Sequence, residues 1–161
     1  MYLLSILLCY NIAMIYIGSD HAGYQMKEKL KIFLKESGYE VSDKGAYKLD
    51  NEDDYPDFII PVAEAVATNT NNIGIILGGS GEGEAISANK IDGIRAIEYY
   101  GGDPKIVKVG REHNNANILS LGARFVNEEE AEEAVRLFLE TKFKGEERHT
   151  RRINKIDKEE K

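Results

Sequence analysis

A glycine-rich turn constrains this chain more than any other stretch. Its sequence is Gly78-Gly79-Ser80-Gly81-Glu82-Gly83-Glu84; it follows the apolar run 73–77, which is typical of a buried strand, and precedes residues 85–90, which can start a helix. Glycine accepts backbone conformations that a side chain forbids, and free amide N–H groups at a helix start can face an anion. A carboxylate beside such donors suggests that an oxyanion is held while a proton moves. A tight turn that merely closes a strand–helix unit is the alternative.

The rest of the chain alternates between strand and helix patterns. Strands are expected at residues 14–17, 39–41, 73–77, 94–97 and 118–122, and helices at 24–36, 55–68, 85–90, 104–113, 128–140 and 146–158. Asp103 and Pro104 are expected to cap and begin the fourth helix, and Asn127 to cap the fifth. This alternation predicts an α/β fold with a five-stranded parallel sheet that helices cover on both faces.

Three polar turns should meet at one rim of that sheet. Residues 18–23 follow the first strand, residues 78–84 the third, and Arg124 comes just after the fifth. In parallel sheets, ligands bind beyond the carboxyl ends of the strands. His113 instead ends a helix before the fifth strand, so we expect it near the opposite rim, where it would serve a neighbouring subunit. The last helix has Ile153 and Ile156 but little else to bury, so it is expected to pack across a dimer.

Composition narrows the classes of partner. The 161 residues suit one domain, and the net charge of −7 disfavours nucleic acid and anionic membranes. Arg148, His149, Arg151 and Arg152 form a local basic cluster that would suit a small anion such as a phosphate. The single cysteine, Cys9, excludes an intrachain disulfide and fits the cytoplasm.

The start of the chain carries no charge up to residue 17. That run is too short for a typical transmembrane helix and lacks the basic start of a secretory signal. Met14 could be the natural start, which would make residues 1–13 an apolar extension. We therefore expect an extension at 1–13, a main domain at 14–144 and a C-terminal helix and tail at 145–161.

Six short motifs, taken together, resemble the type B ribose-5-phosphate isomerases and the related galactose-6-phosphate isomerase subunits. They are Gly18-Ser19-Asp20-His21-Ala22-Gly23, Asp54-Tyr55-Pro56-Asp57, the glycine-rich turn, Asn89-Lys90, Arg111-Glu112-His113-Asn114-Asn115-Ala116-Asn117 and Arg148-His149-Thr150-Arg151-Arg152. Each motif alone is weak, but six in this order are specific. The resemblance covers Met14 to about Ile156.

The resemblance implies a Rossmann-like three-layer fold, a homodimer or tetramer with shared sites, and aldose–ketose isomerisation of a sugar phosphate in the pentose phosphate pathway. It implies neither a metal nor an organic cofactor. Many members place a catalytic cysteine where this chain has Gly78, two residues before Ser80. One branch instead has Gly-Gly-Ser-Gly-x-Gly-Glu and uses the glutamate as the base, and this chain has that pattern.

The resemblance also implies a role for each site residue. Glu84 would move the proton between C2 and C1, and Ser80 would bond a substrate hydroxyl and orient Glu84. His113 with Asp20 would open the sugar ring, and Asn114 would steady the enediolate. Tyr55 would wall the pocket. The backbone of Gly79, Gly81, Glu82 and Gly83 would hold the oxyanion, and Arg124, Arg148, Arg152 and His21 would bind the phosphate.

Other interpretations stay open at this stage. Asp20 could simply cap its turn, and the C-terminal arginines could form surface ion pairs with Glu146 and Glu147. The substrate could be allose or galactose 6-phosphate instead of ribose 5-phosphate. The chain could also be a silent subunit that needs a different partner, or a phosphosugar sensor without catalysis.

Overall fold

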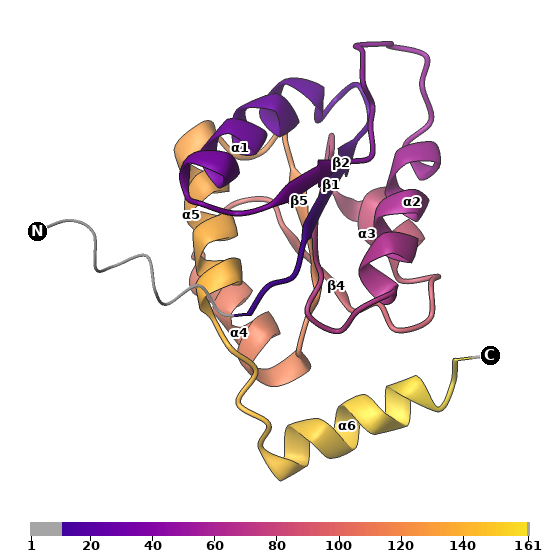
Figure 1. Ribbon diagram of the computed structural model, residues 1–161, viewed down its shortest axis with the longest axis vertical. Coiled ribbons are helices and arrows are strands. Elements are labelled where there is room, and N and C mark those ends of the chain that lie inside the picture. Colours follow the sequence, from indigo (N-terminus) through magenta and orange to yellow (C-terminus); the bar gives the residue numbers. More distant parts are fainter. Residues whose placement is uncertain (1–10, 161) are drawn as a thin grey trace, which may run out of the picture.

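Strands and helices alternate along residues 11–160, the part of the chain that the computed structural model describes (Figure 1). The strands are β1 (Ile15–Ser19), β2 (Val41–Asp43), β3 (Ile73–Gly78), β4 (Ala96–Tyr99) and β5 (Ile118–Gly122). The helices are α1 (Tyr24–Glu36), α2 (Pro56–Ala67), α3 (Glu82–Ala88), α4 (Lys105–Asn114), α5 (Glu128–Glu140) and α6 (Glu147–Asp157).

All strand pairs are parallel, and the order across the sheet is β2-β1-β3-β5-β4. The chain leaves β1 toward β2 on one side and then returns to place β3 on the other side. The strand order therefore reverses between β1 and β3, and such a reversal opens a crevice at the carboxyl ends of the two strands. Both motif-bearing turns, 18–23 and 78–84, begin there.

The core forms because side chains of each strand alternate between the two faces of the sheet. On one face Ile15, Ile17 and Leu119 pack with side chains of α1 and α5. On the other face Ile76 and Ile118 pack with side chains of α2 and α3. Figure 1 shows the same division, with α1, α4 and α5 on one side of the sheet and α2 and α3 on the other. The predicted three-layer α/β fold is confirmed.

Two predicted strands begin two residues too early. Tyr39 N–H still bonds the carbonyl of Leu34 at the end of α1, so strand pairing starts at Val41 instead of Tyr39. Likewise Arg95 N–H bonds the Asn117 side chain at 2.8 Å, so β4 pairs from Ala96 instead of Ile94. In both places a hydrogen bond outside the strand ladder occupies a backbone N–H that the apolar pattern assigned to the sheet.

Helix α3 begins at Glu82, three residues before the predicted start. Gly81 precedes it with a φ of 88°, a left-handed value that glycine adopts readily. Helix α4 differs by one residue, because Pro104 lies before its first turn and Asp103 Oδ1 accepts a hydrogen bond from Lys105 N at 3.0 Å. The early start of α3 matters for function, because it puts Glu84 inside the first helical turn.

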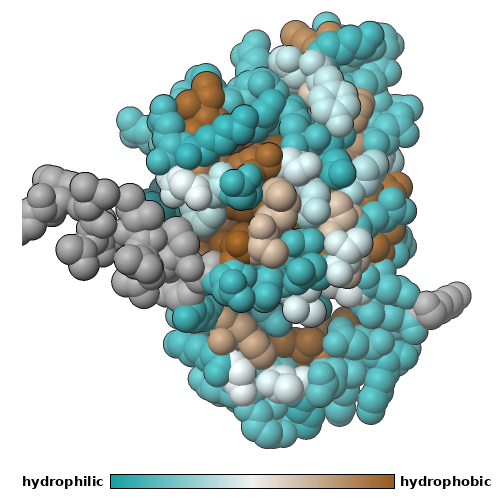
Figure 2. All heavy atoms as spheres, in the orientation of Figure 1, coloured by the Kyte–Doolittle hydropathy of each residue, from teal (hydrophilic) through white to brown (hydrophobic). Residues whose placement is uncertain are grey.

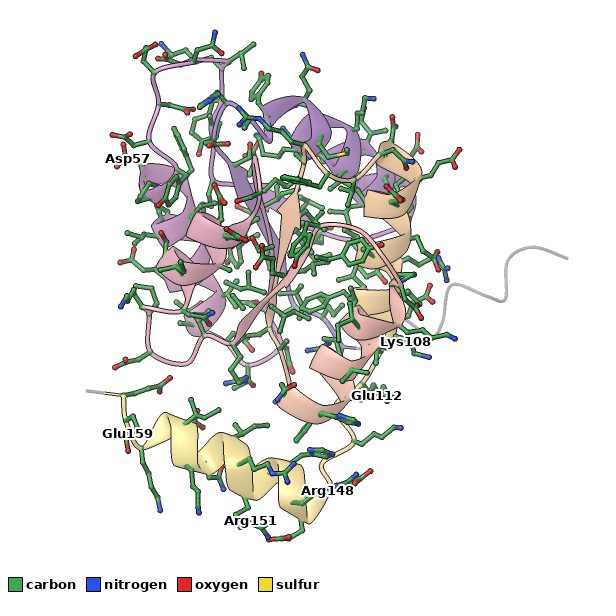
Figure 3. The ribbon with its side chains drawn as sticks, turned by 180° about the vertical axis from the view of Figure 1, so that it is seen from behind. Asp57, Lys108, Glu112, Arg148, Arg151 and Glu159 are labelled. Atoms are coloured by element: carbon green, nitrogen blue, oxygen red, sulfur yellow. The ribbon has the colours of Figure 1, made fainter. Side chains whose placement is uncertain are left out.

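Helix α6 lies apart from the main layers. It follows Gly145, whose φ is 65°, and Figure 1 places it at the end of the molecule away from the carboxyl rim. Figure 3 shows Arg148 and Arg151 on α6 at one end and Asp57, at the start of α2, at the other. In Figure 2, apolar side chains are visible between α6 and the rest of the molecule.

Most of the predicted extension at 1–13 lies outside the described residues. Within residues 11–160 no helix is long and apolar enough to cross a membrane.

Candidate active site

Glu84 is the most deeply placed acid at the carboxyl rim. It is only 4% exposed, although it follows a surface turn. The left-handed Gly81 turns the chain so that the Glu84 side chain folds back over the end of β3. A Cβ atom on Gly78 would overlap the Glu84 carboxylate. The absence of a side chain at Gly78 therefore provides the volume that the carboxylate occupies.

The surroundings of Glu84 raise its pKa. Burial is the main cause, because it disfavours the charged form, and the negative charge of Asp20 adds to it. Hydrogen bonds from the backbone N–H groups of Glu84 and Gly81 act in the opposite direction and are outweighed. A carboxylate whose pKa lies above its ordinary range is a stronger base at neutral pH, which suits a group that takes and returns a proton.

The glycine-rich turn is held by the end of β5. The buried Ser120 hydroxyl donates to the Gly81 carbonyl at 2.6 Å. The amide of Ala123 bonds the Gly78 carbonyl at 2.9 Å, and that of Arg124 bonds the Gly79 carbonyl at 3.0 Å. The Arg124 guanidinium also lies against Gly79, with Nη1 3.1 Å from where a Cβ would stand. The turn is therefore fixed before any ligand arrives, and a cation lies beside it. Sequence reasoning missed Ser120, which carries no motif.

Ser80 and Tyr55 border the same turn. Ser80 Oγ accepts a hydrogen bond from Glu82 N at 3.2 Å, so it supports the first turn of α3. Its expected bonds to a substrate hydroxyl and to Glu84 stay predictions. The Tyr55 ring packs on Gly83, where an added Cβ would come within 2.8 Å of it. Tyr55 thus contacts the glycine-rich turn, and its expected role as a pocket wall stays a prediction.

The turn after β1 contributes Asp20 and His21. Asp20 is 7% exposed, and its Oδ1 accepts hydrogen bonds from the amides of Ala22 at 2.9 Å and Gly23 at 3.2 Å. The capping role considered for Asp20 is therefore present. His21 Nδ1 lies 2.6 Å from Asp53 Oδ1, which also accepts from His21 N at 3.1 Å. Sequence reasoning missed Asp53, because it lies outside the motifs and 32 residues from His21.

One group of described residues has ligand atoms close enough together to hold a metal ion, and it consists of Asp20, His21 and Asp53. One ligand atom from each of the three lies within 4.8 Å of the other two. The His21–Asp53 contact, however, has the 2.6 Å length of a short hydrogen bond. Two donors on one zinc ion, each about 2 Å from it, lie roughly 3 Å apart. The arrangement therefore fits a hydrogen-bonded pair better than a pair of metal ligands.

Figure 1 shows helix α6 and the end of α4 at the opposite rim of the sheet. The end of α4 carries His113 and Asn114, and α6 carries Arg148 and Arg152. The His113 ring stacks on that of His149, with 4.3 Å between centroids and 10° between planes. His149 is buried, and this burial is the main cause that lowers its pKa, with the nearby arginines Arg148 and Arg152 adding to it.

The structure thus divides the predicted site residues between the two rims. The carboxyl rim gathers Glu84, Ser80, Asp20, His21, Tyr55, Gly79, Gly81, Glu82, Gly83 and Arg124. The other four come from the end of α4 and from α6. The placement of His113 away from the glycine-rich turn follows the prediction from its position before β5.

Known proteins resemble this chain over most of its length. A family model described as ribose/galactose isomerase matches residues 15–156. Ribose-5-phosphate isomerase B of Mycobacterium tuberculosis is 40% identical over 140 residues, which cover 87% of this chain and 85% of the relative. Among solved structures, ribose-5-phosphate isomerase B from Clostridium thermocellum superposes with a TM-score of 0.85 at 43% identity, covering 90% of this chain and 95% of the relative.

A second solved structure carries a ligand. Ribose-5-phosphate isomerase B from Mycoplasma genitalium, with bound ribulose-5-phosphate, gives a TM-score of 0.86 at 39% identity and covers 90% of this chain and 94% of the relative. The matched span also agrees with the span of the motifs, from Met14 to about Ile156. On these grounds the chain belongs to the ribose/galactose isomerase family.

Proposed function

We propose that this chain interconverts ribose 5-phosphate and ribulose 5-phosphate through a cis-enediolate. The observation that carries the proposal is the buried carboxylate of Glu84, with its raised pKa, in the space left by Gly78. The choice of a five-carbon sugar is supported by the ribulose-5-phosphate bound in the Mycoplasma genitalium relative and by the names of the curated relatives.

The proton transfer needs one base. The Glu84 carboxylate takes the proton from C2 of the open-chain aldose, and the electrons of that C–H bond form the C1–C2 double bond while the C1 oxygen becomes an oxyanion. The same carboxyl group then returns the proton to C1, the C2 hydroxyl passes its proton to the neighbouring C1 oxyanion, and the C2 oxygen becomes the ketone. One group suffices because the two carbons are neighbours and the enediolate is planar. Backbone amides of the glycine-rich turn hold the developing oxyanion.

Ring opening and phosphate binding need groups from both rims. His113 of a second copy would donate to the ring oxygen while Asp20 accepts from the anomeric hydroxyl, and Asn114 beside it would hold the enediolate. Arg124 and His21 would meet one end of the phosphate, and Arg148 and Arg152 of the second copy the other. Arginine forks match phosphate oxygens, and this remote binding energy positions the reacting carbons.

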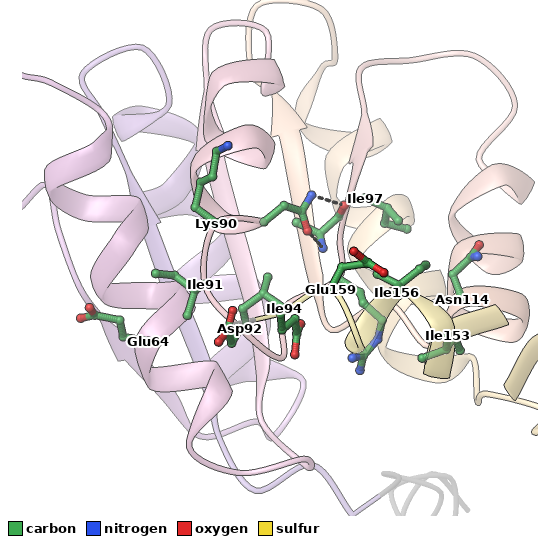
Figure 4. Close-up of a pocket in the computed structure, with 14 residues that line it drawn as sticks. Glu64, Lys90, Ile91, Asp92, Ile94, Ile97, Asn114, Ile153, Ile156 and Glu159 are labelled. Atoms are coloured by element: carbon green, nitrogen blue, oxygen red, sulfur yellow. Dashed lines mark hydrogen bonds between the residues drawn. The ribbon is translucent and has the colours of Figure 1, made fainter. Parts of the chain in front are cut away.

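This division of the site requires at least a homodimer. Support comes from a groove of about 1020 Å³ between α6 and the body, which Figure 4 shows. Ile91, Ile94 and Ile97 line one side, and Ile153 and Ile156 of α6 line the other. Helix α6 packs little against the rest of its own chain, and the groove beside it is lined by apolar side chains. Such an apolar surface suits contact with a second copy of the chain. A tetramer and a cytoplasmic location stay predictions.

The test is turnover of ribose 5-phosphate by the purified chain with EDTA present, compared with Glu84→Gln. We expect activity that survives the chelator and falls by about 10²–10⁴-fold in the variant, the usual contribution of acid–base catalysis. Glu36→Gln, which removes an exposed carboxylate at the end of α1, serves as the control and should match the wild type.

Three outcomes would contradict the proposal in different ways. Equal activity in wild type and Glu84→Gln would exclude Glu84 as the base. Turnover of allose or galactose 6-phosphate alone would replace the substrate. Binding of the sugar phosphate without turnover, in the presence of a verified dimer, would indicate a sensor.

A further inference from the structure

The Asp53–His21 contact lies at the rim that the proposed function uses for phosphate. One Asp53 oxygen faces both the ring and the amide of His21, at 2.6 and 3.1 Å. The Asp53 side chain is 7% exposed, whereas that of His21 is 27% exposed and can reach a ligand. We propose that Asp53 is a positioning residue that keeps His21 a phosphate-facing imidazolium. The inference rests on the proposed function, which assigns His21 to the phosphate.

The geometry fixes which side of the ring faces the site. The two imidazole nitrogens point in different directions, and a hydrogen bond at one determines the role of the other. Because Nδ1 bonds Asp53, the proton on Nε2 is left for a ligand on the far side of the ring. The second bond, from His21 N–H to the same oxygen, holds the backbone and so limits rotation of the ring.

The charges around His21 explain why a counter-charge is needed. Three charged groups face it, namely Asp53 from the loop before α2, Asp20 from the end of β1 and Arg124 from the end of β5. Their combined effect raises the pKa of His21, and its largest cause is the hydrogen bond to Asp53; burial and the positive charge of Arg124 act against it. Two cations that await one phosphate repel each other, and Asp53 offsets that repulsion in the empty site.

Asp20 is a weaker candidate for this role. Its Oδ2 lies 4.0 Å from His21 Nδ1, beyond hydrogen-bond reach, and its Oδ1 already accepts from the turn. Asp53 Oδ2, in contrast, is buried and has no hydrogen-bond partner among the described residues. A buried carboxylate needs a cation beside it. The imidazolium provides that cation, and Asp53 in turn favours the charged form of His21.

Asp53→Asn tests the charge while keeping the shape. The asparagine oxygen can still accept from His21 N–H, so a purely structural role for Asp53 would be retained. Glu52→Gln removes an exposed carboxylate from the adjacent position of the same loop and is the matched control. The chain has three histidines, so the His21 signal in an NMR titration can be assigned from its loss in His21→Gln.

Two readouts are expected to change. The NMR titration midpoint of His21 in the free protein should fall in Asp53→Asn and stay in place in Glu52→Gln. The KM for ribose 5-phosphate should rise roughly three- to tenfold near pH 8 with kcat nearly unchanged, the scale of losing one charge-assisted contact. The pKa of His21 is raised in the folded wild type, so His21 loses its charge at a higher pH there than in Asp53→Asn. The KM of the wild type for ribose 5-phosphate should therefore begin to rise at a higher pH than the KM of the variant.

The double variant separates positioning from fold damage. In a His21→Gln background, Asp53→Asn should leave the pH dependence of KM unchanged, since its effect acts through His21. An unchanged His21 titration in Asp53→Asn would overturn the inference, as would a rise in KM of equal size at every pH. If wild type turns over no ribose 5-phosphate, the proposed function fails while the titration still decides whether Asp53 holds the charge on His21.

Discussion

The two rims of the sheet hold their polar side chains in different ways. At the carboxyl rim, Glu84 is buried, and the turn around it is tied to β5 by Ser120 and by backbone bonds. At the opposite rim, Arg148 and Arg152 are exposed on helix α6, which follows Gly145 and its positive φ. One rim is organised around a buried carboxylate, and the other presents charged groups outward. The difference fits the proposal that the two rims are halves of one site, which is completed when two copies meet.

The largest effect is expected from mixing two inactive variants. Glu84→Gln removes the proposed base at the carboxyl rim, and His113→Asn removes the proposed ring-opening group at the opposite rim. Turnover by each variant homodimer should therefore fall by about 10²–10⁴-fold. If sites are shared, half of the randomly formed dimers are mixed and each has one intact site, so about a quarter of wild-type turnover should return.

The control is a mixture of Glu84→Gln with Gly78→Ala, which break the same rim and should restore nothing. Failure of the first mixture, with mixed dimers verified by native mass spectrometry, would place His113 in the site of its own subunit or outside catalysis.

The next effect concerns Gly78→Ala. The added methyl group would take the volume of the Glu84 carboxylate, and we expect turnover to fall by roughly 10²-fold through misplacement of the base. Gly74→Ala in the same strand is the control, since its methyl would meet the side chains of Ile118 and Val66 instead. Gly74→Ala should lower stability while leaving kcat nearly intact. Equal kcat losses in the two variants would point to general damage of β3.

A smaller effect should distinguish neighbouring arginines on α6. Arg151 bonds both oxygens of Glu147, at 2.8 and 2.7 Å, as the surface ion-pair interpretation expected. We expect Arg152→Ala to raise KM roughly tenfold through loss of one phosphate contact, and Arg151→Ala to change it less than about twofold. Steady-state kinetics would measure both, and similar KM values in the two variants would remove Arg152 from the phosphate site.

The smallest effect is on stability. Because burial raises the pKa of Glu84 in the fold, ionising it costs folding free energy, and this cost grows as pH rises from the unfolded pKa through the folded one. Glu84→Gln should therefore stabilise the protein by about 1 kcal/mol at pH 8, with the gain shrinking toward pH 4. Urea unfolding at fixed protein concentration measures this. A difference that is independent of pH would mean that the Glu84 charge is not the cause.

The sequence predicted the helices and strands well where local patterns determine their bounds. The bounds of α1, β5 and α5 follow from regular apolar spacing, and the Asn127 cap of α5 is present as a capping box. Contacts between segments that are distant in the sequence could not be predicted from such patterns. The overlap of Glu84 with the space at Gly78 depends on the left-handed Gly81, and no periodicity encodes it. Asp53 meets His21 only because the loop before α2 returns to β1, so no spacing marks it.

The lack of a side chain at Gly78 also constrains how the sequence of such a chain can evolve. A side chain at 78 and a carboxylate from 84 need the same volume. A single substitution of Gly78 by cysteine would therefore displace the carboxylate of Glu84, the proposed base, before the new thiol acquired surroundings that lower its own pKa. The fitness effect of each change depends on the other, so an exchange between thiol and carboxylate bases has to alter both positions together.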